Sequence, residues 1–165
     1  MNNLIFGGIS YMYEFDNKIE CLRLDSKFNI NKDGYDKLKL FIKENFSEVG
    51  DFYDSPLSGY HNYSINFNVG DEYCCLTICH NCLLIRRVYL PKLRRGNGFF
   101  SKFLHSLEPL LLEIGITAIC IENIQNDKLL KHLLDNGYSI AYFNYPIPMN
   151  GSDFSLPDAY KILNN

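Results

Sequence analysis

Residues 82–101 read CLLIRRVYLPKLRRGNGFFS, and this stretch contains the pattern that decides the fold. The segment from Cys82 to Leu90 is largely apolar on both faces, as expected of a central strand. The glycines Gly96 and Gly98 then mark a turn. A helix is predicted from about Gly98 to Ile114, because apolar residues recur there at three- and four-residue spacing. The expected buried stripe consists of Phe100, Leu104, Leu107, Leu111 and Ile114. The stretch therefore predicts a strand, a glycine loop and a helix in that order.

The chain after this helix continues the alternation of strands and helices. We expect a strand over Thr117 to Ile124, a helix capped near Asn126 that ends at Asn136-Gly137, and two final strands over Tyr138 to Asn144 and Asp158 to Leu163. Strands that alternate with helices imply parallel pairing in the middle of a mixed sheet. The pattern therefore predicts an α/β fold with a mixed sheet flanked by helices.

The segments before residue 82 add a helix and further strands. Asn31 or Asp33 is a plausible cap for an amphipathic helix that runs to about Phe46. Residues 48–61, rich in Ser, Gly, Asp and Tyr, favour a loop. Strands are expected over these four ranges: 4–15, 19–24, 64–69 and 73–79. Tight turns at Gly70-Asp71 and His80-Asn81 would flank the last of them. We expect residues 1–165 to form a single domain.

The composition excludes several classes of protein. Apolar residues make up 47% and charged residues 21%, which disfavours disorder. A net charge of −3 without a basic face argues against nucleic-acid binding. The longest apolar stretch, Leu110 to Ile121, contains Glu113 and is too short to span a bilayer. The N-terminus lacks the features of a signal peptide, so we expect a cytoplasmic protein whose six cysteines are thiols.

The glycine loop Arg95-Gly96-Asn97-Gly98 has the features of an anion site. Glycine lets the backbone approach a ligand closely and adopt positive φ. The first N–H groups of the following helix have no partner within the helix and lie at the positive end of its dipole. Together these groups suit a pyrophosphate. The alternative is an ordinary strand-to-helix turn that uses glycine for tightness.

This region resembles the GNAT superfamily of N-acetyltransferases. The family motif is Gln or Arg, two variable residues, Gly, one variable residue, then Gly or Ala, between a strand and a helix. Arg95 and Gly98 match its first two defined positions, whereas Phe100 replaces the small third residue. Downstream, Asn126 and Gly137-Tyr138 match the family's Asn, helix, Gly and aromatic residue. The resemblance covers roughly residues 82–144.

The resemblance implies a GNAT-like fold in which the strands Cys82 to Leu90 and Thr117 to Ile124 splay apart. The pantetheine arm of acetyl-CoA, the cosubstrate, would lie in that gap and bond to the backbone around Val88 and Leu90. Asn126 would contact the arm near its thioester end. The pyrophosphate would take the backbone N–H groups of Arg95, Gly96, Asn97, Gly98, Phe99, Phe100 and Ser101.

Acetyl transfer to an amine needs a neutral amine, a stabilised oxyanion and a proton for the leaving thiolate. Backbone N–H groups near Val88 to Leu90 are candidates for the oxyanion site. Glu122, among apolar neighbours, is our candidate for a base that acts through water. An equally plausible alternative is a salt bridge from Glu122 to Arg86 or Arg87.

The acid for the thiolate is harder to assign from the sequence. The family places a tyrosine seven residues after the Asn, where this chain has Leu133. His132 is adjacent but lies about 100° around the helix, so it need not point into the cleft. Tyr138 is a further candidate, as are Tyr142 and Tyr145. Return of the proton through water is another route.

A cluster of cysteines, Cys74, Cys75, Cys79 and Cys82 with His80, has a spacing compatible with zinc. Cys79 and Cys82 flank a two-residue turn, so we expect them to face each other across a hairpin. No second CxxC pair exists to complete a structural site, so we expect core thiols and no metal. The leading hypothesis is thus an acetyl-CoA-dependent N-acetyltransferase acting on an amine of a small molecule or protein. The alternative is a catalytically degenerate acyl-CoA-binding or protein-interaction module on the same fold. A homodimer is left open.

Overall fold

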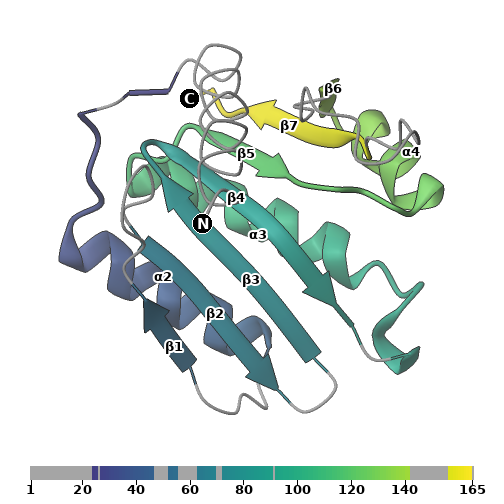
Figure 1. Ribbon diagram of the computed structural model, residues 1–165, viewed down its shortest axis with the longest axis horizontal. Helices are drawn as coiled ribbons and strands as arrows, with labels where there is room; N and C mark the ends of the chain where they lie inside the picture. Colours follow the sequence, from purple (N-terminus) through teal and green to yellow (C-terminus); the bar gives the residue numbers. More distant parts are fainter. Residues whose placement is uncertain are drawn as a thin grey trace, which may run out of the picture.

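The computed structural model describes residues 24–25, 27–46, 52–55, 63–69, 72–90, 92–141 and 156–164 (Figure 1). The helices in this part of the chain are α2 (Lys32–Asn45), α3 (Phe99–Glu113) and α4 (Asp127–Asp135), with a 3-10 turn η1 (Lys92–Arg94). The strands are β1 (Phe52–Ser55), β2 (Tyr63–Val69), β3 (Glu72–Cys79), β4 (Cys82–Tyr89), β5 (Ala118–Ile121), β6 (Ser139–Ala141) and β7 (Asp158–Ile162).

The strands form one seven-stranded sheet in the order β1-β2-β3-β4-β5-β7-β6. β4 and β5 pair in parallel, and every other neighbouring pair in this order is antiparallel. The connection from β4 to β5 passes through α3, as a parallel crossover requires. The expected mixed α/β sheet flanked by helices is confirmed.

The main core lies between the sheet and the three helices, which pack on one face of it (Figure 1). Leu38 and Ile42 of α2, Leu107 of α3 and Leu133 of α4 belong to this buried cluster together with Ile85 of β4. A smaller cluster on the opposite face contains these buried residues: Cys79, Cys82, Leu84, Ala118 and Cys120. The sheet is therefore apolar on both faces along β4 and β5, as the sequence of the central strand predicts.

The start of α2 illustrates how local sequence determines an element. Asn31 has extended backbone angles, and its side-chain oxygen accepts the N–H of Gly34 at 2.8 Å. This bond satisfies one of the amides that a helix start leaves without a partner. Asn31, one of the two caps expected from the sequence, is therefore the cap.

Two expectations differ from the structure. The predicted loop over residues 48–61 contains the four-residue strand β1, which pairs with β2 at the sheet edge. Whether a short edge segment forms a strand depends more on pairing with the neighbouring strand than on the segment's own propensity. On α3, Phe103 is fully buried although the expected stripe omitted it, whereas Phe100 and Ile114 are only half-buried. The expected strands before residue 24 and the turn at Gly70-Asp71 lie outside the described residues.

Candidate active site at the fork between β4 and β5

The parallel pairing of β4 and β5 ends halfway along β4. The last paired residues are Ile85 and Ile121, and the N–H of Glu122 donates to the carbonyl of Ile85 at 3.0 Å. β4 then continues to Tyr89, whereas the chain after Ile121 leaves the strand and leads to α4. A fork thus opens between residues 86–90 and residues 122–126, and we refer to it as the β4–β5 fork (Figure 1).

A β-bulge in β4 lies where the fork begins. Ile85 is opposite Leu76 on β3, but the next pair joins Arg87 to Cys75, so Arg86 is an extra residue. A bulge bends its strand and increases the local twist. It also changes the alternation of side chains, which explains why Val88 packs against the core on the helix side, as Ile85 does. No pattern in the sequence indicates this bulge.

Asn81 holds the closed end of the fork. Its carbonyl accepts the N–H groups of Thr117 and Ala118 at 2.8 and 3.2 Å. Its side chain donates to Thr117 Oγ1 at 2.6 Å and accepts the N–H of Asp25 at 2.6 Å. The turn between β3 and β4 is thereby tied to the start of β5, and the two central strands are fixed at the end opposite the opening.

The glycine loop leads from the open end of β4 into α3. Gly96 and Gly98 have φ of +77° and +70°, and a Cβ added at either would meet no atom within 4 Å. Gly98 precedes the helix without a side-chain cap. The first helical hydrogen bond runs from Lys102 N–H to the carbonyl of Gly98, so the N–H groups of Phe99, Phe100 and Ser101 have no partner within the helix. We refer to these three groups and the glycine turn before them as the amide cradle.

Arg95 differs from the other predicted donors of the loop. Its backbone N–H already donates to the carbonyl of Lys92 at 3.2 Å, so the loop itself uses this amide. The guanidinium lies 4.7 Å from the centre of the Tyr89 ring, and its Nε donates to the carbonyl of Leu90 at 2.6 Å. Arg95 therefore joins the loop to the end of β4, and phosphate binding by its amide remains a prediction.

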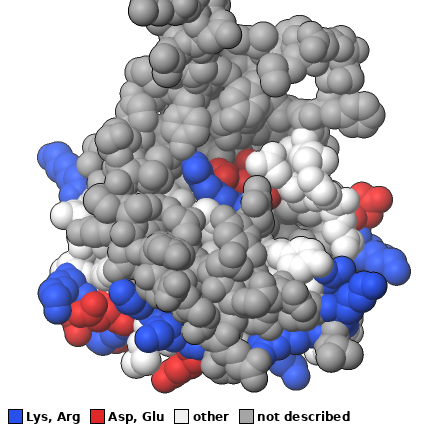
Figure 2. Space-filling view, turned by 60° about the horizontal axis from the view of Figure 1, so that its bottom comes forward, with Lys and Arg blue, Asp and Glu red and all other residues white. Residues whose placement is uncertain are grey.

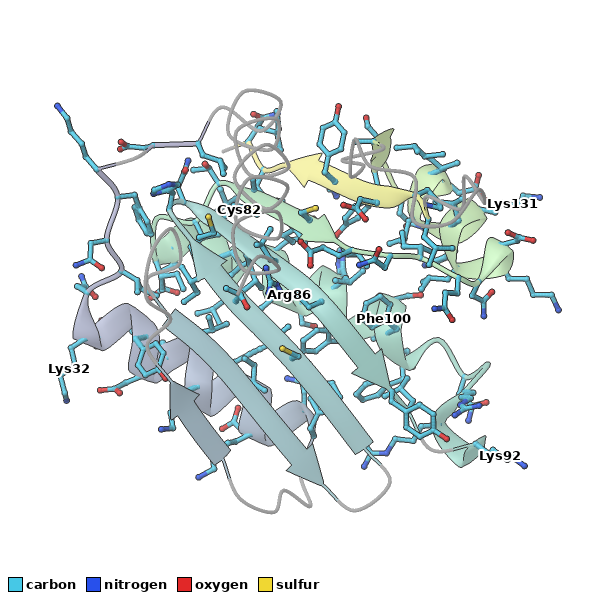
Figure 3. All side chains as sticks on the ribbon, in the orientation of Figure 1. Lys32, Cys82, Arg86, Lys92, Phe100 and Lys131 are labelled. Carbon is cyan, nitrogen blue, oxygen red and sulfur yellow. The ribbon has the colours of Figure 1, made fainter. Side chains whose placement is uncertain are left out.

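Basic and aromatic side chains surround the amide cradle. Arg94 lies 5.4 Å from the centre of the Phe99 ring, and Phe100 stacks on Phe103 at 6.1 Å. In Figure 3, Phe100 lies beside the C-terminal half of β4. Lys and Arg side chains gather at the lower right of Figure 2, the side on which η1 lies in Figure 1. This side of the molecule therefore combines backbone donors with positive charge, which suits an anionic ligand.

Glu122 and Arg86 face each other across the mouth of the fork. Arg86 Nε lies 3.3 Å from Glu122 Oε2, and the Glu122 side chain is only 8% exposed (Figure 3 labels Arg86). The salt bridge left open by the sequence analysis is therefore present. Next to it, Asn123 has a φ of +55°, and its N–H donates to Asp158 Oδ1 at 2.7 Å. A carboxylate is thus held at the point where the two strands separate.

Asn126 begins α4. Its side-chain oxygen accepts the N–H groups of Lys128 and Leu129 at 3.0 and 3.2 Å, which is the arrangement of a helix N-cap. The residue lies at the end of the segment that forms the second side of the fork. The cap uses its side-chain oxygen, whereas its side-chain NH₂ group has no role in these two bonds.

His132 and Tyr138, two of the predicted catalytic residues, line the space between α3 and α4. His132 Nε2 is 2.6 Å from Ser101 Oγ, so a predicted catalytic residue contacts a predicted cofactor-binding residue. Tyr138 is buried, and its hydroxyl donates to Glu108 Oε1 at 3.4 Å. Burial, followed by the charge and hydrogen bond of Glu108, raises the pKa of Tyr138 well above its ordinary value. Leu133 is fully buried in the core.

A small cavity of about 60 Å³ lies among these residues. Its polar lining includes Glu108, whose two oxygens accept from Lys161 Nζ at 2.9 and 2.8 Å. Lys161 is on β7 and Tyr138 precedes β6, so this cluster ties α3 to the far edge of the sheet. The sequence analysis identified neither Glu108 nor Lys161, because 53 residues separate them along the chain.

The cysteines are placed as the hairpin pattern predicts. Cys79 and Cys82 are directly opposite each other across the turn, and Cys120 is buried on the same face. Within the described ranges, no group of three or more His, Cys, Asp or Glu residues is arranged to hold a metal ion. Burial raises the pKa of the Cys74 thiol well above its ordinary value. The three described helices, of which α3 with 15 residues is the longest, fall short of a membrane span.

No family model and no curated protein matches the chain. Many of the solved structures that resemble it are GNAT-family N-acetyltransferases. One is the PaiA N-acetyltransferase of Thermoplasma acidophilum in complex with coenzyme A, at 17% identity, TM-score 0.43 and coverage of 77% of this chain and 70% of that one.

Two further examples are similar over more of their length. A GNAT-family acetyltransferase of Staphylococcus aureus has 15% identity and a TM-score of 0.43, covering 98% of this chain and 96% of that one. A GCN5-related N-acetyltransferase of Kribbella flavida has 13% identity and a TM-score of 0.42, covering 81% and 94%. At these values the similarities carry no argument about chemistry, which depends on the geometry described above.

Proposed function

We propose that this chain is an N-acetyltransferase that moves an acetyl group directly from acetyl-CoA to an amine of a small molecule or protein. The single observation that carries the proposal is the β4–β5 fork, whose open end leads into the amide cradle of α3. An extended arm with a diphosphate at one end matches that combination. The strand edge would bind the arm, and the cradle would bind the diphosphate.

The binding mode follows from which backbone groups the elements leave for a ligand. β4 extends to Tyr89 without β5 beside it, so its backbone around Val88 and Leu90 is the proposed partner of the pantetheine arm. Gly96 and Gly98 carry no side chain over the cradle, and the space above them is open. Asn126, with its NH₂ group outside the cap bonds, is the proposed contact near the thioester.

The proposed reaction is attack of the neutral amine nitrogen on the thioester carbonyl carbon. The C–N bond forms as the C–S bond breaks, the amine loses a proton, and the CoA thiolate gains one. Glu122 is our candidate to accept the amine proton through water, and Arg86 holds its carboxylate at the mouth of the fork. Backbone N–H groups of residues 88–90 are the candidates for stabilising the oxyanion.

Water is the favoured proton donor to the thiolate. Tyr138 is buried against Glu108, and its raised pKa makes it a poor acid. His132 is bonded to Ser101 at the start of α3, so it lies at the diphosphate end of the proposed ligand. Neither of these two predicted residues is therefore needed as the acid in this scheme.

The test is a continuous assay of CoA thiol release with acetyl-CoA and a panel of small amines and lysine peptides, beside thermal melting with acetyl-CoA. We expect a rise in melting temperature and transfer to at least one amine. Glu122→Gln should reduce turnover about 100-fold or more and keep the thermal shift, because general-base catalysis contributes on that scale. Absence of any thermal shift with acetyl-CoA or longer acyl-CoAs would contradict the proposal.

A second candidate is a catalytically degenerate acyl-CoA-binding or protein-interaction module. Leu133 at the family's acid position, buried in the core, is the observation that favours it. This candidate predicts the thermal shift without turnover across the whole amine panel. Acetylation of any amine above the background rate, lost in Glu122→Gln, would exclude it.

We extend the proposal to one domain over residues 1–165 that works in the cytoplasm. The described cysteines, which are thiols rather than disulfides, support a reducing compartment. Limited proteolysis and thiol titration of the protein purified without reductant would test these two points.

A further inference from the structure

A short hydrogen bond connects the amide cradle to α4. Ser101 Oγ, in the first turn of α3, lies 2.6 Å from His132 Nε2. Both side chains are half-buried, and they line the cavity between the two helices. The N–H of Ser101 is one of the three amides of the cradle, so the hydroxyl belongs to a residue of the cradle itself. The bond therefore couples a titratable ring to the cradle.

Protonation of His132 changes what Ser101 can offer to a ligand. The neutral ring can accept the Ser101 O–H, which would turn oxygen lone pairs toward the cradle. The protonated ring can only donate, so its Nε2–H bonds Ser101 Oγ and the serine O–H becomes available to an anion. The same step adds a positive charge behind the hydroxyl. Both changes favour a bound diphosphate.

The charged and titratable groups around His132 come from three elements. His132 is in the last turn of α4, where the helix dipole favours a cation. From α3, His105 and Glu108 line the same cavity, as do Lys161 of β7 and Tyr138, which precedes β6. Glu108 is already paired through both oxygens with Lys161, so it does not neutralise His132 by direct contact.

The remaining neighbours of the ring are on α4 itself. Asn136 Nδ2 lies 3.4 Å from His132 Nδ1 and donates to the His132 carbonyl at 2.7 Å. Lys128 and Lys131 are exposed and add positive charge, and Asp135 is exposed and adds a negative one. Asn136 Nδ2 is also 3.4 Å from His132 Nε2, whereas Ser101 Oγ, at the edge of the cradle, lies closer to this nitrogen at 2.6 Å.

We propose that His132 is a positioning residue, which aims the Ser101 hydroxyl at the diphosphate and makes CoA affinity rise as the ring gains a proton. This inference depends on the proposed function, because it assumes that the diphosphate occupies the amide cradle. It assigns to His132 a role in binding rather than in proton transfer to the thiolate. The affinity for the diphosphate should then depend on pH.

The test is calorimetric titration of the full chain with 3′-dephospho-CoA at about pH 5.5 and about pH 8. This probe keeps the diphosphate but lacks the phosphomonoester, which would itself titrate in this range. We expect the dissociation constant to be about fivefold to tenfold lower at the lower pH. A difference of that size matches the effect of one charge near a helix terminus. His132→Gln should abolish this difference.

Two matched variants separate the role of the hydroxyl from that of helix packing. Ser101→Thr keeps the hydroxyl and should retain the pH dependence, whereas Ser101→Ala should bind more weakly at the lower pH. His105→Gln removes another histidine of the same cavity and should leave the pH dependence unchanged. Melting temperatures of the ligand-free variants establish that each is folded.

The outcomes distinguish this inference from the proposed function. If the wild-type protein binds the probe equally well at both pH values, or if His132→Gln retains the full difference, the inference is wrong while CoA binding stands. If the wild-type protein binds neither CoA nor 3′-dephospho-CoA at either pH, the proposed function itself fails.

Discussion

Replacement of Gly98 by glutamate tests the amide cradle most directly. Gly98 has a φ of +70°, a backbone conformation that costs an L-residue about 1–2 kcal/mol. A Cβ there meets no atom within 4 Å, so the variant should lose stability through backbone strain and not through a clash. For a chain of 165 residues, 1 kcal/mol lowers the melting temperature by about 2–4 °C. The ligand-free variant should therefore melt about 2–8 °C below the wild type.

The effect on the ligand is larger and has a different cause. At an acetyl-CoA concentration of about 100 times its dissociation constant, the wild-type protein gains about 2.7 kcal/mol, or a rise of about 5–11 °C. In Gly98→Glu the carboxylate would occupy the open space above the cradle and repel the diphosphate. We expect this rise to disappear, measured by thermal melting with and without acetyl-CoA.

Two control variants isolate the carboxylate from the strain. Gly98→Ala has the same backbone strain without a charge, and it should keep most of the acetyl-CoA shift. Gly137→Ala places similar strain at a φ of +83°, with Lys161 Cε at 4.0 Å as its nearest atom, away from the cradle. It should keep the whole shift. A Gly98→Glu protein that retains the wild-type shift would refute the assignment of the diphosphate to this loop.

Three further predictions concern α3, α4 and their contacts. Asn126→Ala should lower the free energy of unfolding by about 1 kcal/mol through loss of the cap, whereas Asn126→Asp should keep the cap; urea denaturation measures both. Phe103→Ala should cost about 3–5 kcal/mol, since this ring is fully buried, and the same assay with Lys102→Ala, an exposed neighbour, is the control. The pKa of Tyr138 is raised in the folded protein, so folding favours the protonated hydroxyl. This contribution to stability is fully present below the ordinary tyrosine pKa of about 10 and is lost as the pH rises above that value. Wild-type stability should thus fall more steeply above about pH 10 than that of Tyr138→Phe, and equal slopes would contradict the burial of this hydroxyl.

The order of elements from residue 82 onward could be predicted because local patterns specify it. The apolar run of β4, the glycines before α3 and the cap Asn126 each determine a boundary within a few residues. The same patterns predicted that Cys79 and Cys82 would be opposite each other, since a two-residue turn fixes the register of a hairpin. The fold class follows from this alternation of strands and helices.

The features that the sequence did not reveal depend on pairing across long distances. The bulge at Arg86 arises because Ile85 and Arg87 pair with adjacent residues of β3. Nothing in the sequence of residues 86–88 indicates this shift of register. The contacts of Glu108 with Lys161 and of Ser101 with His132 join residues 53 and 31 positions apart. For Glu122, the ion pair with Arg86 was one of the possibilities left open by the sequence, and only the geometry shows it; its role as a base remains a prediction.

The bonds of Asn81 have a consequence for how a ligand could enter. They anchor the two central strands at one end, while the pairing ends at Ile85 and Ile121. Separation of the strands beyond that point breaks no ladder bond, so the sheet can admit an extended molecule sideways at no cost in backbone pairing. The anchored end would keep its amides protected from hydrogen exchange with solvent, and protection should decline toward Tyr89 for those amides of β4 that point away from β3.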